Sequence, residues 1–377
     1  MSPIAIHTQT SIDEPVRTIK LKGAAVDDQE EVARNTLPGP LKYSGSLDGY
    51  THFEVTPSIG REFGKDLQLS QILKAPNSDD LIRDLAVLIS RRGVCFFRAQ
   101  DVSQDEMMEL QKRISTSAGQ PKESNMCIHP VSENVGEMGA KTQLISAEAQ
   151  RKGGGIMRLH DDVSRWATRA YHSDVSFEKV PADYSMLKIN VLPPTGGDTQ
   201  WVNCYDILDK MSPSMLEYFK TLKAEHNANF FHQEAANHGR TISKTMVRGN
   251  PLNVGDDLSA RHPLIRTNPV TGWNALYYSY GFGGRIQGVT YDEHLFLREY
   301  LMSLAQLCMN NFDCSVRFRW EAGSVAIWDN RSTLHSATFD YKEERNGDRA
   351  SSIGELPYLS REGISKSEGL RAEGKQW

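Results

Sequence analysis

The chain has 377 residues, enough for one large domain or two, and its hydrophobic fraction of 39% supports a core of ordinary size. A net charge of -5 and a pI near 6.1 give no support for nucleic-acid binding or for a polybasic membrane patch. The sequence has no apolar run of the roughly 20 residues that span a bilayer, no secretory signal and no Cys-x-x-Cys among its five cysteines. We therefore expect a cytoplasmic protein without a disulfide framework or a structural zinc site.

Residues 1–50 are polar and predict an extended N-terminal arm with little core of its own. This arm would be either a partly disordered leader or a segment that wraps a neighbouring subunit. A domain is expected from residue 51 onward, because apolar residues there recur at helix and strand spacings. Its first expected elements are a strand at 60–64, a helix at 79–92, a strand at 94–97 and a helix from Ser103 to 118.

Residues 120–170 differ from their surroundings because they are polar, include Gly153–Gly155 and show no sustained period. A structureless segment of this length inside a compact domain is usually functional. We therefore interpret it as a lid. The polar, histidine-bearing segment 224–260 is expected to be a second insert.

The rest of the chain predicts short strands separated by turns, with few helices. Strands are expected at 185–192, 198–203, 263–278 (a hairpin), 317–320 and 325–328, helices at 208–222 and from Thr290 to 307, and a loose tail at 359–377. Many short strands, with helices gathered early and late, favour a mainly β domain over 51–358. The expected fold is a double-stranded β-helix, a cupin-like jelly roll with helices packed outside.

His172 and Asp174 lie in the stretch 171–177, which predicts a β-strand. Side chains alternate along a strand, so these two would project from the same face. An imidazole and a carboxylate are two of the three ligands of a mononuclear Fe(II) site, which needs one more imidazole and leaves three positions open. His-x-Asp should arise by chance roughly once in two such chains, and a second copy begins at His160. That copy lies in the lid, which would hold ligands poorly, so we favour the first.

The third ligand must come from far along the chain, and His335 is the best-placed histidine because it follows a strongly predicted strand and a polar turn. Arg345 and Arg349 lie shortly downstream, and guanidinium groups bind carboxylates in a bidentate manner. The other candidates have weaker contexts: His226, His232 and His238 in the insert, His262 beside a proline, and His294 in a helix.

Taken together, these features resemble the TauD/TfdA (taurine/α-ketoglutarate dioxygenase) family over roughly residues 56–358. The resemblance is carried by several motifs in the family's order. They are Gly60–Gly64, Arg92–Gln100, His172-x-Asp174, the turn Gly196-Gly197-Asp198-Thr199-x-Trp201, the hairpin from His262 to Gly272, and Trp328-Asp329-Asn330-Arg331-x-x-x-His335-x-Ala337 with Asp340-Tyr341.

Residue by residue, the resemblance implies that His172, Asp174 and His335 bind Fe(II) and form the catalytic centre. It implies that Arg345 pairs with the distal carboxylate of α-ketoglutarate, with Thr199 as its companion. Arg349 would then face the acid group of the substrate, with the two arginines exchanged as the alternative. Trp328 is assigned to the α-ketoglutarate site and His129 to the substrate site. Ser132 replaces a tyrosine of the family's taurine site, so taurine itself is not expected.

The resemblance further implies an Fe(II)-dependent dioxygenase that converts α-ketoglutarate and O2 to succinate and CO2. The expected outcome is hydroxylation of an unactivated C–H bond in a small acid: a sulfonate, an amino acid or another carboxylate. One alternative is a secondary-metabolite tailoring oxygenase that performs desaturation or ring closure. Another is a non-catalytic jelly roll that only binds ligands. A homo-oligomer, a dimer or a tetramer, is also expected.

Overall fold

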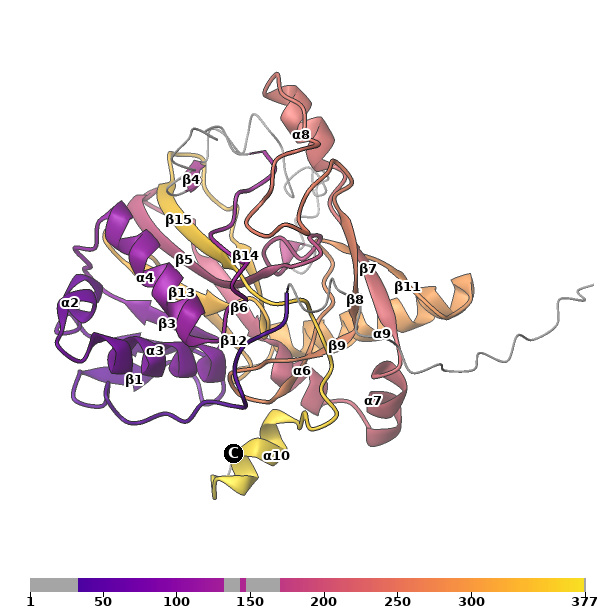
Figure 1. Ribbon diagram of the computed structural model, residues 1–377, viewed down its shortest axis with the longest axis horizontal. Helices are drawn as coiled ribbons and strands as arrows, with labels where there is room; N and C mark the ends of the chain where they lie inside the picture. Colours follow the sequence, from indigo (N-terminus) through magenta and orange to yellow (C-terminus); the bar gives the residue numbers. More distant parts are fainter. Residues whose placement is uncertain (1–32, 132–142, 147–169, 376–377) are drawn as a thin grey trace, which may run out of the picture.

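The computed structural model describes residues 33–131, 143–146 and 170–375 (Figure 1). Its largest sheet has seven strands, antiparallel except for one pair. Their order across the sheet is β1 (His52–Glu54), β2 (Arg61–Phe63), β3 (Val94–Phe97), β13 (Val325–Asp329), β5 (Ala182–Val191), β15 (Asn346–Ile353) and β4 (Gln143–Ser146).

A second sheet packs against the first through an aromatic core. Its strands are β12 (Ser315–Phe318), β6 (Thr199–Asn203) and β14 (Thr333–Ala337), in that order. Trp201 of β6 lies in T-shaped contact with Phe96 of β3 and Trp328 of β13, with ring centroids 5.4 and 5.7 Å apart. The fold is therefore the predicted jelly roll, two facing sheets whose strands do not close into a barrel.

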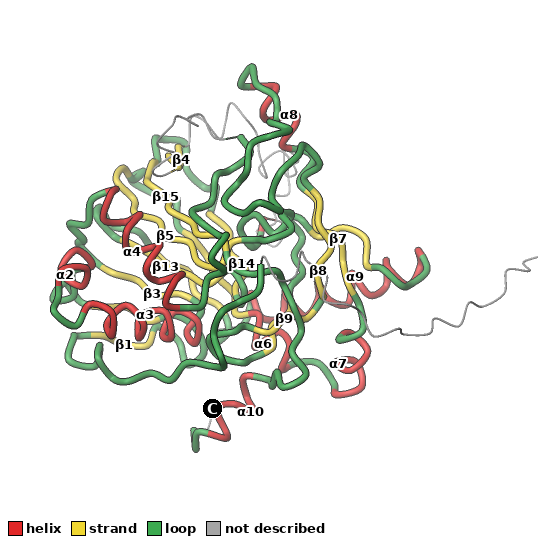
Figure 2. Tube along the Cα trace, viewed as in Figure 1, coloured by secondary structure: helices red, strands yellow, loops and turns green. Residues whose placement is uncertain are grey.

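Helices cover the other face of the large sheet (Figures 1 and 2). α3 (Ser78–Arg92) and α4 (Gln104–Ser117) lie on the sheet, and α2 (Leu69–Lys74) packs on these two helices. Every residue of β13 is buried, because Val325 and Ile327 face this helical layer while Ala326 and Trp328 face the second sheet. A central strand covered on both faces needs an unbroken apolar run, which is why this strand was predicted from sequence.

Smaller sheets and helices complete the domain. They are the sheet β11 (Gly283–Ile286), β7 (Lys223–Asn227) and β8 (Ser259–Pro263), the hairpin β9 (Ile265–Thr267) with β10 (Asn274–Leu276), and the helices α6 (Cys204–Asp209), α7 (Pro213–Phe219), α8 (Phe231–Asn237) and α9 (Tyr291–Met309). The predicted hairpin and the helix after Thr290 are confirmed. In the described part of the chain, no helix has the length and apolarity needed to cross a membrane.

Two local predictions between residues 51 and 358 are wrong. The single helix expected over 208–222 is two helices, because Pro213 occupies the first turn of α7 and the Ser212 side chain caps it. The strand expected over 171–177 makes only one bridge, at His172, and then turns. Val175 has a φ of 44° in that turn, a left-handed conformation that a β-branched residue rarely adopts. Of the expected lid, only 120–131, 143–146 and 170 are described, and His160 lies outside them.

The C-terminal tail, expected to be loose, contains a docked helix, α10 (Lys366–Ala372). A capping box between Ser365 and Glu368 begins it. Leu370 is buried in the same cluster as α6 and α9, and Arg91 of α3 makes two hydrogen bonds of 2.7 and 2.6 Å to Glu373. The tail is therefore part of the packed domain.

Leu370→Ala tests this docking. Leu370 is 7% exposed, so its truncation should lower the free energy of unfolding by about 2–3 kcal/mol, measured by urea denaturation. The truncation of Leu359, which is only partly buried against the same cluster, should cost less. Equal stability of wild type and Leu370→Ala would show that α10 is not docked in solution.

Candidate active site

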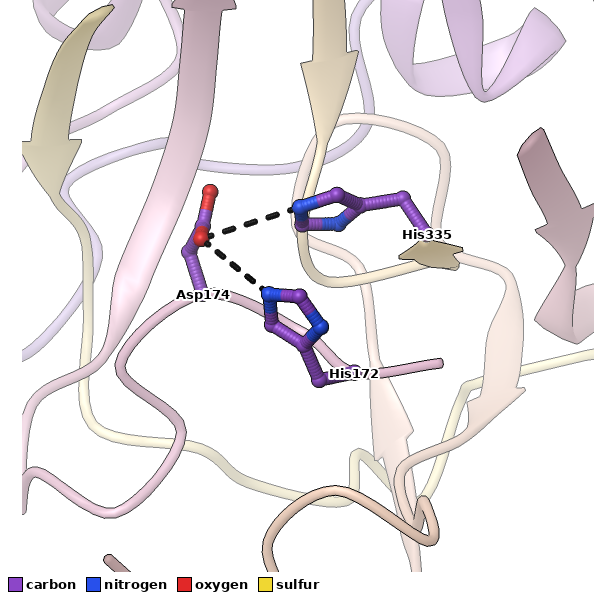
Figure 3. A group of neighbouring side chains, drawn as sticks. All are labelled: His172, Asp174 and His335. Atoms are coloured by element: carbon purple, nitrogen blue, oxygen red, sulfur yellow. Dashed lines mark ion pairs between the residues drawn. The ribbon is translucent and has the colours of Figure 1, made fainter. Parts of the chain in front are cut away.

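The side chains of two histidines and one aspartate point toward one another (Figure 3). His172 and His335 are paired through two backbone hydrogen bonds, with N to O distances of 3.0 and 2.9 Å, which brings their side chains together. The turn after His172 swings Asp174 back, and one oxygen of its carboxylate, Oδ1, lies 3.7 Å from Nε2 of each imidazole. All three candidate ligand atoms lie within 4.8 Å of one another.

Both imidazoles present Nε2 toward Asp174, where a metal could bind. Nδ1 of His172 lies 2.9 Å from the carbonyl oxygen of Ala170, which can only accept, so Nδ1 carries a proton and Nε2 is the ring nitrogen that can bind a metal. Burial, and then the neighbouring His172, lower the pKa of His335 to about 3. His335 is therefore neutral at physiological pH, the form that binds a metal.

Asp174 supplies the negative charge of the site. Burial alone would raise its pKa, but Arg349 holds the pKa of this carboxyl well below its usual range, with Nη1 only 3.0 Å from Oδ1. Two imidazoles and one ionised carboxylate form the facial triad that suits Fe(II) and leaves positions open for other ligands. The donor set therefore fits the expected metal.

Arg345 lies just before β15 and is fully buried. Its Nε donates to the carbonyl oxygen of Gly197 at 2.8 Å and its Nη2 to Oγ1 of Thr199 at 3.4 Å. Within the described residues it forms no ion pair with a carboxylate, and burial lowers its pKa. A buried guanidinium without a carboxylate partner is costly, so this arginine fits an anionic ligand such as α-ketoglutarate.

Gly197 brings the backbone against Arg345. Its φ is 73°, and a Cβ there would lie 3.0 Å from Cδ of Arg345. Its N–H donates to Oδ1 of Asp340 at 2.9 Å, and Arg317 bridges Asp340 and Asp198. The turn thus holds Arg345 in place from one side.

Gly197→Ala should raise KM for α-ketoglutarate roughly tenfold, because it strains the backbone by about 1–2 kcal/mol and displaces the guanidinium. Gly239→Ala is a matched control, since Gly239 has a φ of 70° but, apart from its chain neighbours, no heavy atom of the described residues lies within 4 Å of its would-be Cβ. Steady-state kinetics with varied α-ketoglutarate measure the effect. A KM that changes equally in both variants would mean that the contact with Arg345 does not matter.

The remaining predicted site residues lie around the triad. The Trp328 ring packs 4.8 Å from that of His335, and its role toward α-ketoglutarate stays a prediction. His129 lies edge-on to Phe231 with centroids 4.9 Å apart, and burial, then Arg349, lower its pKa to about 3. The side chains of Arg349 and His172 are 16% and 17% exposed, more than those of His335 and Asp174, which are 8% and 5% exposed.

Three site residues were missed by sequence reasoning. Trp320 donates from Nε1 to Oγ1 of Thr199 at 3.0 Å, and Ser185 donates to Oδ2 of Asp174 at 2.7 Å. Asn330 bonds to both Asp174 and Ser185. Asn330 belongs to the motif Trp328-Asp329-Asn330-Arg331-x-x-x-His335, whereas no local pattern marks Ser185. The rival His262 is a structural residue, because its Nε2 bonds to the carbonyl oxygens of Ser176 and Glu178.

A jelly roll that carries this triad, together with a buried arginine that has no carboxylate partner in the described part of the chain, defines a class of oxygenases that use Fe(II) and a 2-oxo acid. The particular family follows from comparison: the chain belongs to the taurine catabolism dioxygenase TauD, TfdA family, whose model matches residues 51–350. It is an Fe(II)- and α-ketoglutarate-dependent dioxygenase, which uses O2 as its oxidant.

Named relatives support this assignment. The chain is 37% identical to the α-ketoglutarate-dependent dioxygenase oryG of Aspergillus oryzae over 90% of this chain and 98% of that one. It is 36% identical to the α-ketoglutarate-dependent dioxygenase esdpJ of Penicillium shearii, over 88% and 96%. A taurine dioxygenase from Burkholderia xenovorans has a similar crystal structure, with a TM-score of 0.61 and 25% identity over 83% of this chain and 94% of that one.

Proposed function

We propose that this dioxygenase hydroxylates an unactivated C–H bond of a small acidic substrate. His172, Asp174 and His335 would hold the iron, Arg345 with Thr199 would hold the distal carboxylate of α-ketoglutarate, and Arg349 would hold the acid group of the substrate. The observation that carries the proposal is the pair of arginines. Arg345 is buried and has no carboxylate partner among the described residues, and Arg349 is partly exposed and lies 3.0 Å from Asp174.

The bound iron and α-ketoglutarate supply the oxidising chemistry, in which O2 is consumed and succinate and CO2 are released. The protein's own residues bind and orient. Arg345 would bind the distal carboxylate of α-ketoglutarate, so that the 2-oxo acid group at the other end points at the triad. Arg349, 3.0 Å from Asp174, would place the substrate's acid close to the triad and so bring a neighbouring C–H bond within reach.

The aromatic surroundings support a substrate with an apolar part. Phe282 lies edge-on to His172 with ring centroids 5.5 Å apart, and it contacts Phe177 at 5.2 Å and Phe230 at 6.1 Å. Aromatic rings favour apolar partners over hydrated ones. We therefore propose a sulfonate or carboxylate that carries an alkyl or aryl group rather than a compact polar acid such as taurine.

The test is a screen for succinate release with Fe(II), α-ketoglutarate and O2. Alkyl and aryl sulfonates, sulfate esters, aryloxy acids and amino acids are compared with matched neutral analogues. We expect release above the substrate-free rate only with acids. A product that gains one oxygen would support hydroxylation, whereas the loss of two hydrogens would favour the tailoring alternative. No succinate with any compound would favour a non-catalytic binding protein.

A further inference from the structure

Asn330 is a buried amide that contacts the candidate ligand Asp174 by two routes. It lies in the turn between β13 and β14 and is 0% exposed. Its Oδ1 accepts the backbone N–H of Asp174 at 3.1 Å and the indole N–H of Trp328 at 3.1 Å. Its Nδ2 donates to Oγ of Ser185 at 2.9 Å, and Ser185 in turn donates to Oδ2 of Asp174 at 2.7 Å.

The direction of every bond in this network is determined by chemistry. The N–H groups of Asp174 and Trp328 can only donate, so the amide oxygen of Asn330 must face them and its NH2 must face Ser185. Ser185 has one hydroxyl hydrogen and gives it to the carboxylate, which can only accept. It is therefore an acceptor toward Asn330 and toward Ser351, whose Oγ lies 2.8 Å away. No member can rotate without losing a bond.

The network also holds the backbone between the two ligands of the turn. The hydroxyl of Ser173, which lies between His172 and Asp174, donates to the carbonyl oxygen of Asn330 at 2.7 Å. The next residue but one, Val175, has a φ of 44°. Such a conformation costs of order 1–3 kcal/mol and persists only where neighbours hold it. Asn330 provides two of the bonds that hold this turn.

We infer that Asn330 is a positioning residue that fixes Asp174 as a ligand through Oδ1 alone, with Oδ2 occupied by Ser185. This inference rests on the proposed iron site. Oδ1 is the oxygen that lies 3.7 Å from Nε2 of both imidazoles. It also accepts from Nη1 of Arg349 at 3.0 Å, and its second lone pair is left for the metal, so the network selects which oxygen meets the metal. Outer partners of this kind typically contribute 10–100-fold to metal affinity.

The test is anaerobic titration of the metal-free protein with Mn(II), with free Mn(II) followed by electron paramagnetic resonance. We expect Asn330→Ala and Ser185→Ala to raise the Kd for Mn(II) 10–100-fold. Asn268→Ala is the matched control: this equally buried asparagine donates to Asp329 at 2.9 Å and has no bond to Asp174. Its Kd should equal that of the wild type. Thermal unfolding without metal reports the fold of each variant, and Ser185→Ala decides the question if Asn330→Ala does not fold.

His172→Ala separates the two possible failures. If it binds Mn(II) as the wild type does, the proposed iron site is wrong. If it loses binding while Ser185→Ala and any folded Asn330→Ala retain wild-type affinity, the site stands and the positioning role is overturned. A Kd raised equally in Asn268→Ala would also overturn it, since the effect would then be general loss of structure.

Discussion

His172→Ala is expected to lower succinate formation about 1,000-fold or more, because the iron loses one of only three protein ligands. The remaining pair, Asp174 and His335, would hold Fe(II) weakly. Anaerobic addition of Fe(II) and α-ketoglutarate to the wild type should give a weak visible charge-transfer band, and this band should be absent in the variant. The band depends on the assembled site and not on turnover, so it tests the ligand role directly.

His232→Ala is the matched control for this experiment. The side chain of His232 is exposed on α8, where its Nε2 lies 2.7 Å from the carbonyl oxygen of Asp256. This variant should retain both the band and the rate of succinate formation. A band of unchanged intensity in His172→Ala would contradict the assignment of the metal site.

The triad was predicted from sequence even though the local structure around it was not. The alternation argument placed His172 and Asp174 on one face of a strand, whereas the structure brings them together by a turn with Val175 in a left-handed conformation. The side chains of His172 and Asp174 can approach each other in a strand or in a turn, because only one residue lies between them. His335 was found because β14 follows a strand whose apolar run is unmistakable.

The supporting network could not be predicted because its members lie far apart in the sequence. Ser185 is 11 residues from Asp174, and Asn330 is 156 residues from it. No single helix or strand runs through either separation, so no local pattern relates the pairs. The helix α10 was missed for another reason: the Ser365–Glu368 capping signature is present in the sequence, but the surrounding charge concealed it.

Arg345→Ala and Arg349→Ala should affect different molecules. Loss of a buried guanidinium that pairs with a carboxylate costs about 3 kcal/mol, roughly 100-fold in apparent affinity. Arg345→Ala should therefore raise KM for α-ketoglutarate about 100-fold and change KM for the acidic substrate little. Arg349→Ala should raise KM for the acidic substrate and change KM for α-ketoglutarate little. Steady-state kinetics with each compound varied in turn measure both constants. Opposite results would mean that the two arginines exchange roles.

A keto acid without the distal carboxylate sharpens this test. 2-Oxopentanoate keeps the reactive end of α-ketoglutarate but offers nothing to the proposed partner of Arg345. The wild type should therefore discriminate against it about 100-fold, because its use leaves a buried guanidinium unpaired. Arg345→Ala should lose most of this discrimination, whereas Arg349→Ala should keep it. Arg349→Ala also removes a positive charge, one that lies 3.0 Å from Asp174. If this variant still discriminates against 2-oxopentanoate, recognition of the distal carboxylate depends on Arg345 and not on the total charge of the site.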